Sequence, residues 1–241
     1  MSEEVTYNPQ AASLDPTHSN RSFKPRVLIA CEYSGIERSA FQSVGCDTWS
    51  CDLLPSEIPG QHIQDDVLAH LEDGWDLIIA HPPCTYLSRA ANNVWNEKGR
   101  AAKRAQSLAL FLALYYSPAA RVCVENPIGW PGAVFREPDQ IIHPYFFGDR
   151  HLKRTALWLR GLPHLDFKLT DDLFGTRSAT DKPNPMYVDN TPRQKKRYFT
   201  DGLHGSHARS RSFPHVAQAM AEQWGRLLVT TLNNQEVYHH E

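Results

Sequence analysis

The residues of this chain with the clearest chemical potential follow short apolar segments. Residues Leu77–Ala80 form a four-residue apolar run, two prolines follow it, and Cys84 comes directly after them. Because proline cannot donate to a β-ladder, the run predicts a strand that ends just before Cys84. Glu125 closes a second run, RVCVE, in the same way. A thiol and a carboxylate are therefore expected where two buried strands end.

A cysteine and a glutamate that share one cleft suit chemistry on a pyrimidine ring. Carbon 5 of the ring becomes nucleophilic only after a group adds to carbon 6, and a cysteine sulfur can form that bond. A carboxylic acid at ring nitrogen 3 stabilises the resulting enamine, and loss of the proton on carbon 5 later expels the thiol. We therefore predict Cys84 as the nucleophile and Glu125 as the acid. The alternative for Cys84 is a small buried thiol that fills a gap in the core.

The elements that must position these residues alternate along the chain. Apolar runs at 27–31, 46–52, 76–80 and 121–125 predict strands, and helical spacing appears at 36–44 and 104–116. This alternation predicts a mostly parallel sheet with helices on both faces. The carboxyl ends of parallel strands meet at one edge, which is where such folds bind ligands.

Two further strand ends predict a nucleotide-like cofactor. Ser34 and Gly35 suit a tight turn that brings backbone N–H groups and a helix N-terminus toward a ligand. Asp52 lies about 20 residues after the first strand, where nucleotide-binding folds place a carboxylate for ribose hydroxyls. The alternative for Asp52 is a turn cap, and for Asp65 and Asp66 it is the cap of a short helix.

Composition indicates one soluble core. The chain has 241 residues, of which 41% are hydrophobic and 22% charged, and its net charge is −2. We expect a flexible tail at 1–24, a catalytic domain at 25–165, a polar region at 166–210, a closing helix at 211–232 and a C-terminal tail at 233–241. No segment resembles a membrane span or a signal peptide.

The cysteines and histidines argue against a metal site. Five cysteines, an odd number, indicate reduced thiols in a cytoplasmic protein rather than a disulfide framework. Cys46 and Cys51 have no second pair at ligand spacing, so no metal is expected. His81 is expected to be structural, since no histidine pairs convincingly as a base. We expect a monomer that does not bind membranes.

Seven segments, taken in order, resemble motifs of the DNA (cytosine-5) methyltransferases, in a short form like that of bacteriophages. The strongest are HPPCTYLS at 81–88, similar to the family's Pro-Cys motif, and VENP at 124–127, similar to its Glu-Asn motif. The others are VLIACEYSGIERSAF at 27–41, WSCDLLPSE at 49–57, DDVL at 65–68, LKRTALWL at 152–159 and RSFPHVAQAMAEQW at 211–224.

The resemblance implies a Rossmann-like methyltransferase fold that binds S-adenosylmethionine. It implies methyl transfer to carbon 5 of a cytosine flipped out of DNA, in a bacterium or phage-infected host cell. It places Arg154 on the carbonyl oxygen of the base. The implied cofactor residues are Glu32, Tyr33, Ser34, Gly35, Asp52, Leu53, Asp66, Val67 and Pro82. The implied DNA contacts are Ser88, Arg89, Lys195, Lys196 and Arg197.

The chain also departs from the family. The first motif keeps only Gly35 of the usual glycines, and Gln194–Arg197 is a second match for the arginine motif. Only 45 residues, 166–210, are available for target recognition. Two alternatives therefore stay open: a pyrimidine carbon-5 transferase that uses a free nucleotide or a modified donor, and a non-catalytic nucleic-acid-binding relative.

Overall fold

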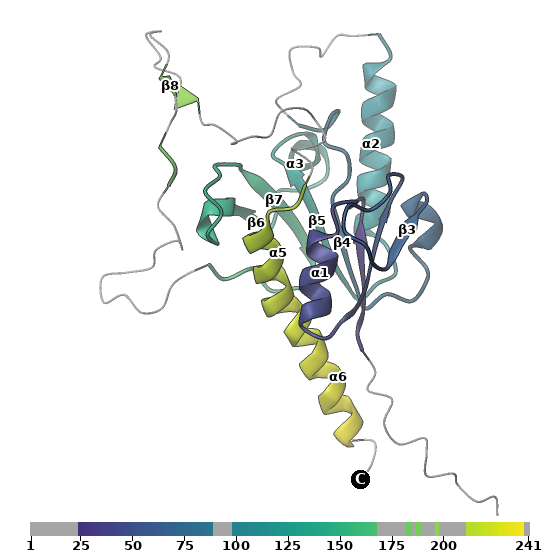
Figure 1. Ribbon diagram of the computed structural model, residues 1–241. Coiled ribbons are helices and arrows are strands. Elements are labelled where there is room, and N and C mark those ends of the chain that lie inside the picture. Colours follow the sequence, from purple (N-terminus) through teal and green to yellow (C-terminus); the bar gives the residue numbers. More distant parts are fainter. Residues whose placement is uncertain are drawn as a thin grey trace, which may run out of the picture.

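A computed structural model describes residues 24–88, 98–167, 182–184, 187–188, 196–197 and 211–238. Seven strands form one sheet in the order β3-β2-β1-β4-β5-β7-β6 (Figure 1). Strands β1 to β5 run parallel, and β7 runs antiparallel to both of its neighbours. The strands are β1 (Arg26–Ala30), β2 (Asp47–Asp52), β3 (His62–Gln64), β4 (Leu77–Ala80), β5 (Arg121–Pro127), β6 (Gln140–Ile142) and β7 (Thr155–Arg160).

The register of the central strands brings three strand ends together. Ala80, the last residue of β4, pairs with Ala30 of β1 on one side and with Val124 of β5 on the other. The turn after β1 and the Pro-Pro-Cys loop after β4 therefore leave the sheet at the same edge, beside Glu125, which lies two residues before the end of β5. This edge is where an open α/β sheet binds its ligands.

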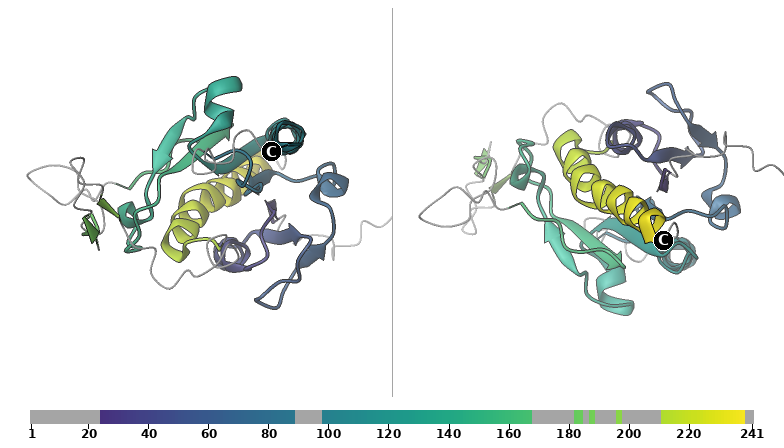
Figure 2. Two further views of the ribbon diagram at one scale, coloured as in Figure 1. Left: turned by 90° about the horizontal axis from the view of Figure 1, so that it is seen from above. Right: turned by 90° about the horizontal axis from the view of Figure 1, so that it is seen from below.

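Helices cover both faces of the sheet, as the two views in Figure 2 show. Helix α2 packs on one face, while α1 and the rod formed by α5 and α6 pack on the other. The helices are α1 (Ile36–Ser43), α2 (Arg100–Tyr115), α3 (Trp130–Val134), α5 (Pro214–Met220) and α6 (Arg226–Tyr238), with a π-helical turn at Ala221–Gly225 and 3-10 turns at Val67–His70 and Pro144–Phe146.

Alternate residues of each strand feed two separate cores. Ile78 packs with the face that holds Phe111 of α2, whereas Ile79 packs with the face that holds Phe41 of α1 and Trp224. All of these side chains are buried. A strand with apolar residues on both faces reads as the continuous apolar run seen in the sequence.

The predicted Rossmann-like arrangement, a mostly parallel sheet with helices on both faces, is confirmed. Three boundaries differ from expectation by more than one residue. Helix α2 begins at Arg100 rather than 104, β5 runs on to Pro127, and α6 extends to Tyr238, so residues 233–238 are helical rather than part of a tail. No proline or glycine follows Gly225, so nothing in the sequence ends the last helix early. No helix in the described ranges is both long and apolar enough to cross a membrane.

A separate two-stranded antiparallel pair, β8 (Tyr187–Val188) and β9 (Lys196–Arg197), falls within the polar region. The backbones of Lys196 and Arg197 are therefore described, while Lys195 and Arg89 lie outside the described residues. The DNA contacts predicted for these four residues stay predictions.

Candidate functional site

The turn after β1 is braced by its own carboxylate. The Glu32 side chain is 3% exposed, and its Oε1 accepts hydrogen bonds from the Ser34 hydroxyl and from the N–H of Gly35, the latter at 2.7 Å. Burial raises the pKa of Glu32 above its usual value. Its Oε2 is buried and accepts no hydrogen bond from the described residues. Gly35 has a φ of 75°, which glycine adopts without strain, and α1 begins directly after it.

The end of β2 lies beside this turn. The N–H of Glu32 donates to the carbonyl of Cys51 at 3.1 Å, so Asp52 follows at the same edge of the sheet. Asp52 Oδ1 accepts the N–H of Leu54 at 2.9 Å, and the Leu53 side chain is 72% exposed. A carboxylate and an exposed apolar side chain thus stand together at a strand end.

Asp66 and Val67 occupy a short 3-10 turn. Asp66 Oδ1 accepts the N–H of Leu68 at 3.0 Å and so caps this turn, while Val67 is buried. The capping alternative is therefore what the structure shows for the Asp66 side chain. A contact from these two residues to a cofactor stays a prediction.

Arg38 orders the loop at 53–61, and sequence reasoning missed it. The side chain is 1% exposed, and one guanidinium nitrogen donates to the hydroxyls of Ser50 at 2.8 Å and Ser56 at 3.2 Å. The other nitrogen donates to the carbonyl of Ile58. A Cβ on Gly35 would lie 2.7 Å from the guanidinium, so the tight turn and the loop close around this one side chain.

The Pro-Pro-Cys loop is tied to the end of β5. The Asn126 side-chain amide donates to the carbonyl of Pro82 at 2.9 Å, and both residues are buried. The carbonyl of Cys84 accepts the N–H groups of Leu87 at 3.0 Å and Ser88 at 2.9 Å. Cys84 therefore opens a compact turn whose start is fixed by the Glu-Asn motif.

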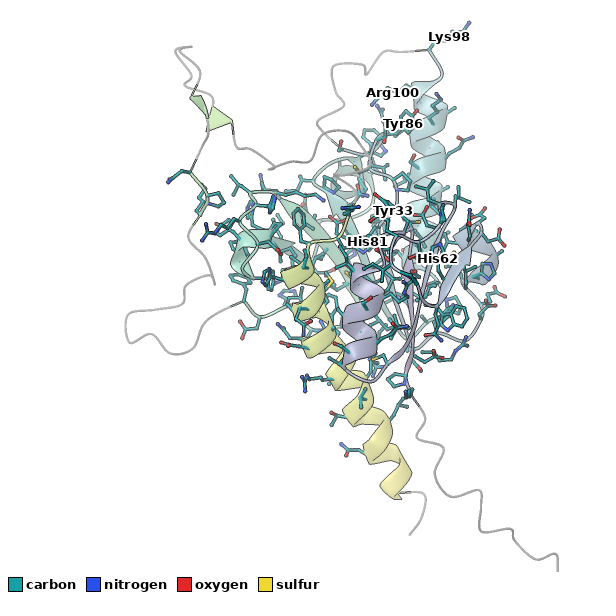
Figure 3. The ribbon with its side chains drawn as sticks, in the orientation of Figure 1. Tyr33, His62, His81, Tyr86, Lys98 and Arg100 are labelled. Atoms are coloured by element: carbon teal, nitrogen blue, oxygen red, sulfur yellow. The ribbon has the colours of Figure 1, made fainter. Side chains whose placement is uncertain are left out.

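The far end of the loop is pinned just as closely. The N–H of Trp130 donates to the carbonyl of Leu87 at 2.7 Å, and Ser88 forms a β-bridge with Gly129. A Cβ on Gly129 would lie 2.0 Å from that carbonyl oxygen. The loop also packs against the start of α2, where the Arg100 guanidinium lies 5.3 Å from the centre of the Tyr86 ring (Figure 3).

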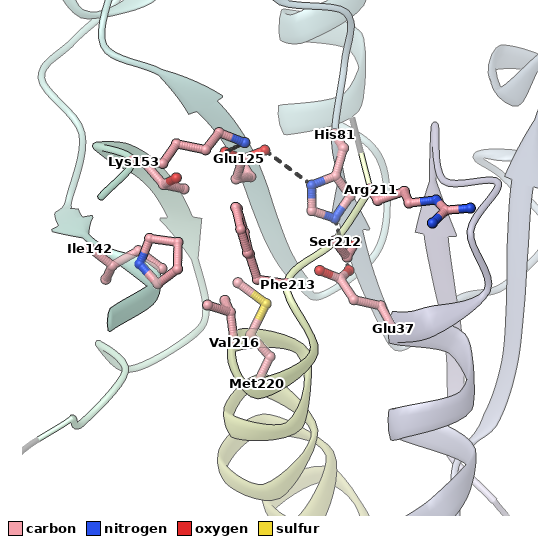
Figure 4. A pocket seen from close by; sticks show the side chains of 12 residues that line it. Glu37, His81, Glu125, Ile142, Lys153, Arg211, Ser212, Phe213, Val216 and Met220 are labelled. Carbon is pink, nitrogen blue, oxygen red and sulfur yellow. Dashed lines mark hydrogen bonds and ion pairs between the residues drawn. The ribbon is translucent and has the colours of Figure 1, made fainter. Parts of the chain in front are cut away.

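Three titratable side chains meet at this edge of the sheet: Glu37, which is buried, and His81 and Glu125, whose side chains are each 15% exposed (Figure 4). His81 Nδ1 lies 3.2 Å from Glu125 Oε2, and His81 Nε2 lies 2.8 Å from Glu37 Oε2. Glu125 Oε1 lies 3.9 Å from the Lys153 ammonium and accepts no hydrogen bond from the described residues.

The charges in this cluster stabilise one another. Burial alone would lower the pKa of His81, but Glu37 and Glu125 outweigh burial and raise it to about 10. Burial alone would raise the pKa of Glu125, but Lys153 and His81 outweigh it and lower the pKa to about 2. Near neutral pH, His81 is therefore an imidazolium between two carboxylates.

Glu125 opens into a cavity between the sheet edge and the segment that precedes α5. Its polar wall includes Glu37, His81, Lys153 and Arg211, and its apolar wall includes Phe213 (Figure 4). The remaining lining residues are Ile142, Pro144, Thr155, Ser212, Val216 and Met220. The segment before α5 thus forms part of the wall of the cavity.

Some of the predicted site residues line the cavity and others do not. Glu125 lines it, whereas Cys84 does not. Arg154 is exposed and outside the lining, and the neighbouring Lys153 occupies the place expected for a cation. The predicted base contact of Arg154 is not part of this geometry. Of the missed residues, Glu37 carried a signal, because it lies four residues before Phe41 on the buried face of α1.

A scan against protein-family models and a search of curated proteins found no match. Among solved structures, the chain is similar to DNMT2 from Spodoptera frugiperda at 15% identity and a TM-score of 0.39, covering 67% of this chain and 58% of that one. It is similar to the methyltransferase EhMeth from Entamoeba histolytica at 15% identity and a TM-score of 0.41, covering 70% of this chain and 61% of that one.

The chain thus spans about three fifths of the length of these two proteins, and likeness at this level carries no argument about reaction or substrate. The strand order β3-β2-β1-β4-β5-β7-β6, in which β7 runs against its neighbours, gives the chain a Rossmann-like α/β fold.

Proposed function

We propose that this protein transfers a methyl group from S-adenosylmethionine to carbon 5 of cytosine in DNA. The observation that carries the proposal is the hydrogen bond from Asn126 to the carbonyl of Pro82. It joins the residue after Glu125 to a residue two positions before Cys84, so the two proposed reactive groups leave neighbouring strand ends in a fixed relation. A cysteine that only filled space in the core would not require its loop to be tied to the end of β5.

The cofactor would lie at the ends of β1 and β2, and the residues there fit its parts. Asp52 offers carboxylate oxygens to ribose hydroxyls, and Leu53 offers exposed apolar surface to a purine ring. The buried Oε2 of Glu32 lacks a donor among the described residues, as an acceptor for a bound ammonium group would. When bound, S-adenosylmethionine supplies an electrophilic methyl group.

The residues of the chain would act on a base flipped out of the helix. The Cys84 thiolate forms a bond to ring carbon 6, and the electrons of the ring double bond move to carbon 5, which takes the methyl group. Glu125 pairs with the edge of the ring that carries nitrogen 3, and Lys153 is the cation nearest to that carboxylate. Loss of the proton on carbon 5 then re-forms the double bond as the bond from sulfur to carbon 6 breaks.

The decisive experiment traps the bond to sulfur. The protein is incubated with labelled S-adenosylmethionine and duplex DNA that contains 5-fluorocytosine, since fluorine cannot leave as a proton does. We expect a covalent complex that mass spectrometry locates at Cys84, and none with Cys84→Ser. Cys46→Ser, which changes a thiol just before β2 at the opposite edge of the sheet, is the matched control and should still form the complex.

Parallel arms separate the alternatives. Single-stranded DNA and the free cytidine nucleotide replace the duplex under the same conditions. If only the free nucleotide were labelled, the substrate would be a nucleotide rather than DNA, and the mechanism would be unchanged. Full methyl transfer by Cys84→Ser would contradict the mechanism. Absence of any transfer, with DNA binding retained, would favour the non-catalytic relative.

A further inference from the structure

Both ring nitrogens of His81 contact carboxylates. His81 follows β4 directly, and its ring is bracketed by carboxylates from two different elements, Glu37 of α1 and Glu125 of β5. Glu37 is 2% exposed and lies on the first turn of α1. Burying two carboxylates is costly unless each is paired, so the imidazolium is the group that makes this arrangement stable.

The charged groups that surround His81 also favour its protonated state. The charged groups that line the cavity with His81 are Glu37, Glu125, Lys153 and Arg211, and the guanidinium of Arg211 is paired with Glu57 at 2.7 Å. Glu32, in the turn after β1, adds a further nearby carboxyl group. Around the imidazolium, the nearest partners are therefore the two carboxylates.

We propose that His81 is a positioning residue: anchored by Glu37, it holds Glu125 as an oriented carboxylate whose second oxygen is left to pair with the base. The inference rests on the proposed function, and it concerns how Glu125 meets the base. His81 itself touches Glu125 rather than the ring. Oε2 of Glu125 contacts the imidazole, whereas Oε1 lies buried 3.9 Å from the Lys153 ammonium and accepts no hydrogen bond from the described residues, so Oε1 is the oxygen with capacity left for a ligand.

As a consequence of this proposal, the proton between Glu125 and ring nitrogen 3 would be carried by the ring rather than by Glu125. Cytosine presents a donor at its exocyclic amine and an acceptor at ring nitrogen 3. A Glu125 held as a carboxylate pairs best with a ring that is protonated at nitrogen 3, because both groups on that edge are then donors. The ring takes this proton from the solvent as it binds and returns it to the solvent when the product leaves. While protonated, the ring is the more electrophilic toward sulfur. Glu125 then stabilises the proton on the ring instead of delivering its own.

The test combines a titration with kinetics. The imidazole signal of His81, assigned by its loss in His81→Gln, is followed by NMR against pH in the free protein. We expect it to stay protonated well above the ordinary pKa of 6.5, and Glu37→Gln to shift the midpoint downward. A wild-type midpoint near 6.5 would overturn the proposal. The titration needs no catalysis, so it stands even if the proposed reaction does not.

The kinetic arm uses His81→Gln and Glu37→Gln, with the exposed His164→Gln as matched control. We expect kcat to fall by about 10-fold to 100-fold in both, because a carboxylate misplaced by about an ångström reacts poorly. The KM for S-adenosylmethionine should be unchanged. The wild-type rate should fall at high pH as His81 loses its proton, and Glu37→Gln should move that fall to lower pH. A wild-type kcat and pH profile in both variants, with Cys84-dependent transfer intact, would refute the role of His81 and leave the proposed function standing.

Discussion

The side-chain amide of Asn126 donates a 2.9 Å hydrogen bond to the carbonyl oxygen of Pro82, and this contact joins the two motifs that carry the proposed chemistry. The segment after β4 leaves the ladder, so the Pro82 carbonyl has no neighbouring strand to pair with. Asn126 supplies the donor that the sheet does not. The reactive loop is thus positioned by a side chain rather than by regular secondary structure.

Replacing Asn126 with alanine should therefore cost more in activity than in stability. The buried Pro82 carbonyl would lose its donor, at a cost of about 1–3 kcal/mol in the free energy of unfolding. The Cys84 loop would then move relative to Glu125, and methyl transfer should fall well beyond what the loss of folded protein explains. Urea unfolding and a single-turnover transfer assay measure the two effects. If Asn126→Ala had the unfolding free energy and the transfer rate of the wild type, the hydrogen bond would not position the loop.

Gly129 fixes the other end of the loop by having no side chain. A Cβ there would lie 2.0 Å from the Leu87 carbonyl, so Gly129→Ala must push the two segments apart. We expect a loss of about 1–3 kcal/mol in unfolding free energy, in the range of other overpacked sites, and reduced reactivity of Cys84.

Gly132→Ala is the matched control for that substitution. A Cβ on Gly132, in the same short helix region, would meet nothing closer than 3.7 Å. Alanine favours helix over glycine, so this variant should be as stable as the wild type or slightly more so. Thermal unfolding of the pair, with iodoacetamide labelling of Cys84, separates a steric effect at 129 from a general intolerance of alanine.

The fold was predictable because its main signals are local. The runs ending at Ala30, Ala80 and Glu125 are apolar on both faces, and such runs indicate buried parallel strands whatever the rest of the chain does. The strand ends then follow from the topology. The early start of α2 at Arg100 was missed because its first turn carries basic residues and no acidic one, a pattern that helix N-termini usually avoid.

The interior of the site was less predictable, because its contacts join residues far apart in sequence. His81 and Glu125 are 44 residues apart, and so are His81 and Glu37. Nothing near His81 in the sequence indicates that both ring nitrogens meet carboxylates. The sequence favours Arg154 over the second match at Gln194–Arg197, because Arg154 directly precedes a strand. Side chains alternate along an extended segment, however, and the neighbouring Lys153 is the residue whose ammonium lies 3.9 Å from Glu125.

Substitution of Arg38 tests how the loop at 53–61 is held in place. Its guanidinium reaches Ser50, Ser56 and the Ile58 carbonyl at once, and a lysine ammonium cannot span the three. Arg38→Lys should lose about 2–4 kcal/mol of unfolding free energy, since buried hydrogen bonds to a charged group are lost. Weaker binding of S-adenosylhomocysteine, measured by calorimetry, should accompany it.

The exposed Arg226 of α6 gives the control for that charge-conserving change. Arg226→Lys should alter neither unfolding free energy nor ligand affinity. If Arg38→Lys were destabilised yet bound the ligand with unchanged affinity, Arg38 would support the core alone, and the ordering of the loop at 53–61 would have another origin.

The low pKa of Glu125 predicts how stability depends on acid. The folded protein holds this carboxyl at a pKa of about 2, below the usual 4.5, so between these two values the unfolded chain binds the extra proton. The stabilisation from Glu125 is complete above about pH 4.5 and is lost as the pH falls toward 2, by at most about 1.4 kcal/mol per pH unit. Glu125→Gln has no such proton to bind. The difference in unfolding free energy between the two proteins, measured by urea titration from pH 6 to the acid limit of the native state, should therefore shrink as the pH falls below about 4.5. A difference that stays constant over this range would mean that Glu125 keeps an ordinary pKa, and the imidazolium between Glu37 and Glu125 would then not control the site.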